Sequence, residues 1–248
     1  GCRLGIGAFR LWGLRVSSNH ESIEFPAERP IVLVSSHHSS LDMCFLLGLL
    51  ENAFGDRNLR FVSRPGLDRG LPTISFYIKQ YCYSLGSAGA FKARRKKEDR
   101  LHMAQYCQQM NRDNGVVTIF PEGVKARELP EHSGSFNPNG LRLMLENMPD
   151  AVVVPLAIKG SGDFYCTPRQ WKHLLQGVPQ FGVSVKLSML PPLEPRNYAS
   201  KAALIAHCET LISNEYERLS HGKEIPVDAD RYMSVGDEAA ETDFEEAC

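Results

Sequence analysis

A histidine and a carboxylate five residues apart form the pattern in this chain that best suits proton transfer. They are His37 and Asp42, within the stretch SHHSSLD that lies between an apolar run at 31–34 and a second apolar run beginning near residue 43. A carboxylate can orient an imidazole, and the imidazole can then take a proton from a substrate hydroxyl. The pattern therefore favours acyl transfer to an alcohol.

The spacing of these two residues requires a bend in the chain. Residues five apart lie roughly 140° apart around an ideal helix, so His37 and Asp42 cannot share a helix face. We expect His37 in a loop and Asp42 in the first turn of a helix, from which the carboxylate reaches back to the ring. Ser39-x-x-Asp42 also resembles a capping box, in which Asp42 would serve only the start of the helix, and this alternative stays open. His38 is expected to be a neighbour and not a second base, and no metal is expected, because a site of these side chains lacks a further ligand at helical spacing.

A second polar group directly follows the apolar run at 116–120, in the stretch FPEGVKAR that holds Glu122. Gly123 permits a tight or left-handed backbone, which would expose amides beside Lys125 and Arg127. Exposed amides with two cations suit a phosphate, whereas the alternative is an ordinary solvated turn.

A third stretch, at 86–97, is a glycine-containing run that ends with five cations in six residues, Arg94 among them. Such a run could bind a phosphate or anionic lipid headgroups. It is also typical of a solvated face or a nucleic-acid patch, but Phe91 alone is a poor platform for stacking bases. We therefore expect no nucleic-acid partner.

Strands and helices are expected to alternate along the chain. Short β-branched runs predict strands at 31–34, 59–62, 116–120, 152–158 and 183–190. Helical periodicity predicts helices at 43–51, 73–83, 97–112, 140–147, 170–175 and 201–219, the last capped by Ser200. This order predicts an α/β fold with a largely parallel sheet flanked by helices. Sites in such sheets collect where strands end, which is where the first two polar groups lie.

Composition is consistent with one folded domain and two different ends. The 248 residues are 43% apolar, enough for one sizeable core. Residues 1–20 form an amphipathic segment with arginines and no acid before residue 21, which could lie in a membrane interface or pack on the domain. Residues 222–248 are expected to form an acidic, disordered tail. From residue 227 onward there are eight acids against one base, a net charge of −7, which leaves +6 on the rest of the chain. The sequence contains no run of about 18 apolar residues, so no membrane span is expected. The absence of an initiator Met leaves open that the chain is a fragment. Seven scattered cysteines indicate a reducing compartment.

The order of four blocks, SHHSSLD, GAFKAR, FPEG and VVVPLAI, resembles the glycerolipid acyltransferases, typified by lysophosphatidic acid acyltransferase. The resemblance covers roughly residues 30–192 and implies an acyltransferase domain at 21–221. It implies that His37 is the general base and that Asp42 orients it. It further implies that Arg94, Glu122 and Gly123 hold the glycerol phosphate of the acceptor.

The same resemblance implies the substrates and the location. The donor would be acyl-CoA or acyl carrier protein, the acceptor a glycerophospholipid such as 1-acylglycerol 3-phosphate, and the product phosphatidic acid. No cofactor beyond the donor is expected, and the protein would act on a membrane surface, at its cytoplasmic face. Val124-Lys125 replace the Thr-Arg that is usual in this family, and Arg127 could offset this change. The replacement leaves the identity of the acceptor open. Two alternatives stay open: a non-catalytic membrane-binding module of the same fold, and a thioesterase-type hydrolase.

Overall fold

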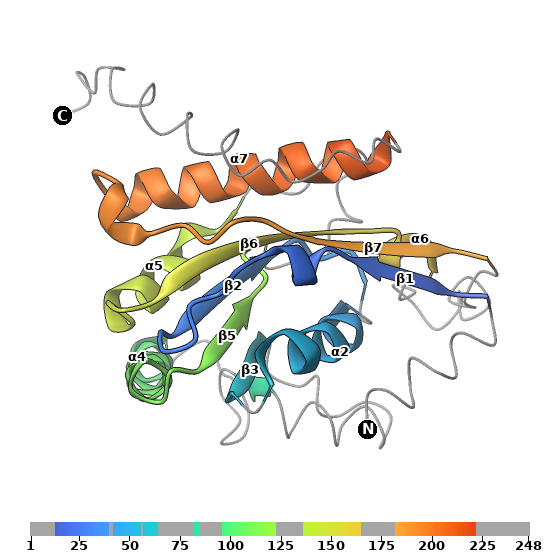
Figure 1. Ribbon diagram of the computed structural model, residues 1–248. Helices are drawn as coiled ribbons and strands as arrows, with labels where there is room; N and C mark the ends of the chain where they lie inside the picture. The colour runs from blue at the N-terminus through green and yellow to red at the C-terminus, as the bar shows by residue number, and fades with distance from the viewer. Residues whose placement is uncertain are drawn as a thin grey trace, which may run out of the picture.

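The structure is a computed structural model that describes residues 13–39, 42–55, 57–63, 82–84, 96–122, 136–164 and 182–221. Within these ranges it contains a seven-stranded sheet in the order β1-β7-β6-β2-β5-β3-β4. The strands are β1 (Arg15–Ser18), β2 (Ile31–Ser35), β3 (Leu59–Ser63), β4 (Cys82–Ser84), β5 (Val116–Ile119), β6 (Val152–Lys159) and β7 (Ser184–Met189). Helices α2 and α7 lie on opposite faces of this sheet (Figure 1).

The centre of the sheet is parallel, as the alternation of strands and helices predicts. β2 pairs in parallel with β5 on one side and with β6 on the other, and β3 continues the parallel order beside β5. β7 runs antiparallel to β6, and β1 then pairs in parallel with β7. The carboxyl ends of β2, β5 and β6 therefore lie at one edge of the sheet, together with the amino ends of β7 and β1.

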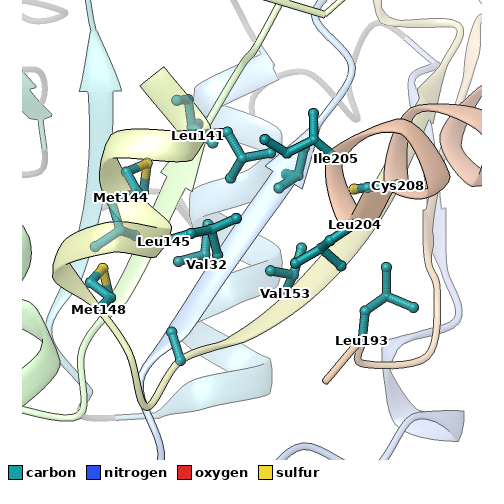
Figure 2. Packing of buried hydrophobic residues seen from close by; sticks show 14 of the residues in the cluster. Val32, Leu141, Met144, Leu145, Met148, Val153, Leu193, Leu204, Ile205 and Cys208 are labelled. Carbon is teal, nitrogen blue, oxygen red and sulfur yellow. The ribbon is translucent and has the colours of Figure 1, made fainter. Parts of the chain in front are cut away.

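Helices cover both faces because the central strands are apolar on both sides. Every residue of β2 and β5 is buried, which is typical of strands between two helical layers. One face packs against α2 (Asp42–Phe54), and the other against α4 (Lys96–Arg112), α5 (Pro138–Asn147) and α7 (Lys201–Ser220). Figure 2 shows side chains of α5 and α7 meeting over Val32 of β2 and Val153 of β6. The remaining short elements are the one-turn helix α6 (Ser161–Phe164) and the 3-10 turns η1 (His20–Ser22) and η6 (Pro195–Asn197).

Side-chain caps fix the start of two helices. The Ser200 hydroxyl accepts a hydrogen bond from the Ala203 backbone N–H at 3.1 Å, as predicted from its position before α7. Asn137 caps α5 in the same way, with Pro138 in the first turn. No helix of the described ranges is both long enough and apolar enough to cross a membrane.

The predicted elements match the structure closely in the centre of the sheet and less well at its margins. The five predicted strands are present within a residue or so of their expected ends, and four of the six predicted helices are present. The helix predicted at 73–83 is wrong at its last two residues, because residues 82–84 form β4 beside β3, and the rest of that helix lies outside the described residues. The helix predicted at 170–175 and the tail at 222–248 lie outside the described residues.

The amino-terminal part of the chain also needs a correction. Residues 15–18, expected within a separate amphipathic segment at 1–20, form β1 at the edge of the sheet. The strand was missed because its RVSS sequence is mostly exposed and carries one apolar side chain, so backbone pairing with β7 and not burial defines it. Residues 1–12 lie outside the described ranges.

Candidate functional site

Two of the three polar stretches lie next to each other at the carboxyl edge of the sheet. β2 and β5 are neighbouring parallel strands, and Val34 is opposite Ile119 near their ends. His37 follows β2 by two residues, and Glu122 follows β5 by three. Parallel strands carry both motifs to the same edge, as the sequence predicted.

The Asp42 carboxylate accepts hydrogen bonds from three N–H groups in the turn before α2. Its Oδ2 accepts from the Nδ1 of His37 at 2.9 Å and from the backbone N–H groups of His38 at 2.7 Å and Ser39 at 2.8 Å. The carboxylate has no solvent exposure, whereas the His37 side chain is 18% exposed. Asp42 is thus fixed inside the protein, and the imidazole that it holds remains accessible.

Asp42 serves both the start of α2 and the His37 ring. It accepts a hydrogen bond from the Ser39 N–H, as the acid of a capping box does, but it is the first residue of α2, whereas a capping box places the acid at the third helical position. The same oxygen binds the His37 ring. The start of the helix and the orientation of the imidazole therefore depend on one carboxylate oxygen.

The contacts of His37 within the described residues involve Nδ1 and the face of the ring. In a neutral ring that donates its Nδ1 proton to Asp42, the lone pair lies on Nε2. The ring stacks on Phe120, with centroids 4.4 Å apart and planes at 29°. Phe120 lies between β5 and Glu122, so the second motif supports the imidazole of the first.

Glu122 is a buried acid beside this pair. It is 6% exposed, and burial raises the pKa of its carboxyl to about 8. The His37 backbone N–H is the next largest influence and lowers this pKa, whereas the charges of Asp42 and Glu209 raise it by smaller amounts. Neither carboxyl oxygen has a partner at hydrogen-bonding distance and angle within the part of the chain that the structure describes. Glu122 is therefore largely protonated near neutral pH and able to donate a hydrogen bond.

The ring of His38 packs against helix α7. Its ring stacks on Tyr216 of α7, with centroids 4.7 Å apart and planes at 20°. Burial lowers the pKa of His38, outweighing the opposite effect of Asp42. His38 is thus a neutral neighbour, as expected, and the described ranges contain no cluster of three or more His, Cys, Asp or Glu side chains that could hold a metal ion.

The structure places only part of the predicted site. His37, Asp42 and Glu122 come together, whereas Arg94, Gly123, Lys125 and Arg127 lie outside the described residues. Glu209, Tyr216 and Lys159 were not predicted to lie at this edge. Lys159 could have been found, because it ends a strand parallel to β2. The two α7 residues are distant in sequence, and no local pattern marks them.

The chain is similar in sequence to known acyltransferases. The 1-acyl-sn-glycerol-3-phosphate acyltransferase alpha of Homo sapiens is 29% identical over 160 residues, which cover 63% of this chain and 50% of that protein. The protein of the same name from Ovis aries is 28% identical over 166 residues, with 63% and 49% covered. The chain thus spans about half the length of the curated relatives that it matches.

A solved structure shares the fold. The crystal structure of the 1-acyl-sn-glycerophosphate (LPA) acyltransferase PlsC from Thermotoga maritima superposes with a TM-score of 0.62 at 22% identity, covering 88% of this chain and 78% of that one. The family model named Acyltransferase matches residues 17–159, more than half of the chain, and this range includes His37, Asp42 and Glu122. The chain therefore belongs to the acyltransferase family.

Proposed function

We propose that this protein transfers a fatty acyl group from a thioester to the hydroxyl of a glycerol-phosphate lipid. The observation that carries the proposal is the 2.9 Å contact between His37 Nδ1 and the buried carboxylate of Asp42. Membership of the acyltransferase family and the names of the matched relatives support 1-acylglycerol 3-phosphate as the acceptor and phosphatidic acid as the product.

The chemistry follows from the tautomer of His37. Nε2 removes the proton of the acceptor hydroxyl as its oxygen attacks the thioester carbonyl, and Asp42 stabilises the imidazolium that forms. The tetrahedral intermediate then collapses, the carbon–sulfur bond breaks, and the thiolate takes the proton back from Nε2. The products are an ester and a thiol, and no covalent acyl-enzyme forms.

Phosphate binding is assigned to the two remaining motifs. Arg94, Lys125 and Arg127 are proposed to supply positive charge, and Gly123 to supply a backbone amide. Glu122 suits this site in its protonated form, because a neutral carboxyl donates a hydrogen bond to a phosphate or glycerol oxygen without repelling the anion. A buried carboxylate anion at the same place would oppose binding.

The proposal extends to the donor and the place of action. Acyl-CoA or acyl carrier protein supplies the thioester, whose cleavage drives the reaction, so no metal or redox cofactor is required. The acceptor lies in a bilayer, and the protein is therefore proposed to work at a membrane surface, at the cytoplasmic face.

Mass spectrometry of lipid products tests the proposal most broadly. The purified chain is incubated with mixed acyl-CoAs and a panel of glycerol 3-phosphate, 1-acylglycerol 3-phosphate and other lysophospholipids in vesicles. A new diacyl lipid carrying the phosphate headgroup is the expected product. Release of free fatty acid with or without an acceptor would instead show a thioesterase. Vesicle binding without any acyl transfer would show a non-catalytic membrane module.

A further inference from the structure

The turn that carries His37 is held from the far side by helix α7. His38 lies next to the proposed base and stacks on Tyr216, which belongs to the last turns of α7. The backbone of His38 also packs against α6, since a Cβ added at Gly162 would lie 3.5 Å from both the Cβ and the carbonyl oxygen of His38. The His38 residue is therefore enclosed by α6 and α7.

Tyr216 is itself fixed by a strand of the central sheet. The Nζ of Lys159, the last residue of β6, donates to the Tyr216 hydroxyl at 3.1 Å. The same ammonium lies 4.5 Å from the centroid of the Tyr216 ring, within cation–π range. Two contacts from one lysine thus limit both the tilt and the translation of the ring on which His38 stacks.

The stacked pair bears directly on the orientation of the base. The His38 backbone N–H donates to Asp42 Oδ2 at 2.7 Å, and this oxygen also accepts from His37 Nδ1. A rotation of residue 38 would move its N–H away from Oδ2 and would displace the preceding residue, His37, with it. The position of the imidazole therefore depends on how firmly the His38 ring is held.

We propose that Tyr216 is a positioning residue for His37, acting through the His38 ring, the His38 backbone N–H and Asp42. The proposal rests on the proposed function for its kinetic consequences, but the orientation of His37 can be measured without any substrate. The ring of Tyr216 carries the effect, and its hydroxyl serves only to anchor the ring to Lys159. Removing the ring should therefore matter more than removing the hydroxyl.

Three variants test this proposal: Tyr216→Leu, Tyr216→Phe and Tyr198→Leu. Tyr198 is the matched control, since it is also a partly buried tyrosine that packs on the α7 core and pairs with a histidine, with its hydroxyl 2.6 Å from His207 Nδ1. His207 precedes Tyr216 by nine residues on α7, about 13 Å along the helix axis. Loss of the Tyr198 ring should thus disturb packing without changing the contact between His37 and Asp42.

The first readout is the tautomer of His37, observed by ¹H–¹⁵N correlation NMR of the substrate-free protein with ¹⁵N-labelled histidine, and assigned with His37→Gln. Wild type, Tyr216→Phe and Tyr198→Leu should show His37 protonated at Nδ1, whereas Tyr216→Leu should show averaged shifts of mixed tautomers. A wild-type spectrum for a folded Tyr216→Leu variant would overturn the proposal, and so would the same averaging in Tyr198→Leu.

The second readout is steady-state kinetics. An aromatic stacking contact corresponds to roughly a two- to tenfold change in the population of the aligned state, so Tyr216→Leu should lower kcat by about that factor with KM almost unchanged. Should this variant fail to fold, His38→Leu removes the same stack from the other side and must show the same tautomer averaging. A chain with no transferase activity would refute the proposed function, while the NMR result would still decide the role of Tyr216.

Discussion

Replacing Glu122 by glutamine should change how the stability of the protein depends on pH. The pKa of Glu122 rises from its ordinary value of 4.5 to about 8 in the folded protein, chiefly because of burial. Between these values the folded state keeps a proton that the unfolded chain releases, so the stability of the folded state falls as the pH rises. Above about pH 8 both states are ionised and the loss is complete.

The size of the effect follows from the shift. Each pH unit within the window corresponds to about 1.4 kcal/mol, so wild type should lose about 3 kcal/mol from this carboxyl between pH 5 and pH 7.5. The Glu122→Gln variant would keep the shape and the hydrogen-bond donor of the protonated acid, but its side chain could not ionise. The free energy of unfolding of Glu122→Gln, relative to wild type, should therefore rise by about 3 kcal/mol over this interval.

Urea unfolding followed by circular dichroism at several pH values measures this difference. Glu146→Gln is the control, because Glu146 is exposed on α5 and should leave the pH slope of wild type unchanged. A constant difference between Glu122→Gln and wild type from pH 5 to pH 7.5 would refute the reasoning. It would mean that Glu122 ionises in the folded protein as it does in the unfolded chain, and the neutral hydrogen-bond donor proposed here would be lost.

Three further predictions test other parts of the structure. Asp42→Asn removes the charge opposite the imidazolium, so kcat should fall on the order of 10²- to 10⁴-fold in a folded protein, and activity above a tenth of wild type would contradict this. Gly160 has φ +90°, and Gly160→Ala would place a Cβ 2.1 Å from a backbone oxygen of β7, whereas a Cβ at Gly55 meets nothing within 4 Å. Gly160→Ala should therefore lower the free energy of unfolding by about 2–4 kcal/mol, and the control Gly55→Ala by about 1 kcal/mol. Equal shifts in Tm for the two variants would contradict the clash. Ser36→Ala removes the hydroxyl that accepts a 3.0 Å hydrogen bond from a buried N–H of β6. The free energy of unfolding, measured with denaturant, should fall by about 1–3 kcal/mol. A change below about 0.5 kcal/mol would contradict this expectation.

The contact between His37 and Asp42 could be predicted from the sequence because the patterns that produce it are local. The apolar run at 31–34, the bend of SHHSSLD and the apolar run after it define a strand, a turn and a helix within about 20 residues, and this unit alone brings His37 to Asp42. The second motif follows a strand of the same kind. Parallel pairing of β2 with β5 then places Glu122 beside His37 and Asp42.

The rest of the site depends on contacts that no local pattern encodes. Tyr216 meets His38 across 178 residues, and Glu209 affects the pKa of Glu122 from a helix that the sequence predicts but cannot orient. β1 and β4 escaped prediction because they are short edge strands, defined by their hydrogen-bonded neighbour and not by an apolar period. Long-range packing therefore decides which groups surround His37, while the local sequence brings His37 to Asp42.

Acyl transfer by the His37→Ala variant tests the central claim most directly. Wild type and variant are assayed with the acyl-CoA and lysophospholipid that give product in the mass-spectrometric screen, after circular dichroism has shown that both are folded. If His37 is the base that Asp42 holds at 2.9 Å, turnover should fall on the order of 10²- to 10⁴-fold. Turnover within twofold of wild type would show that another group takes the proton.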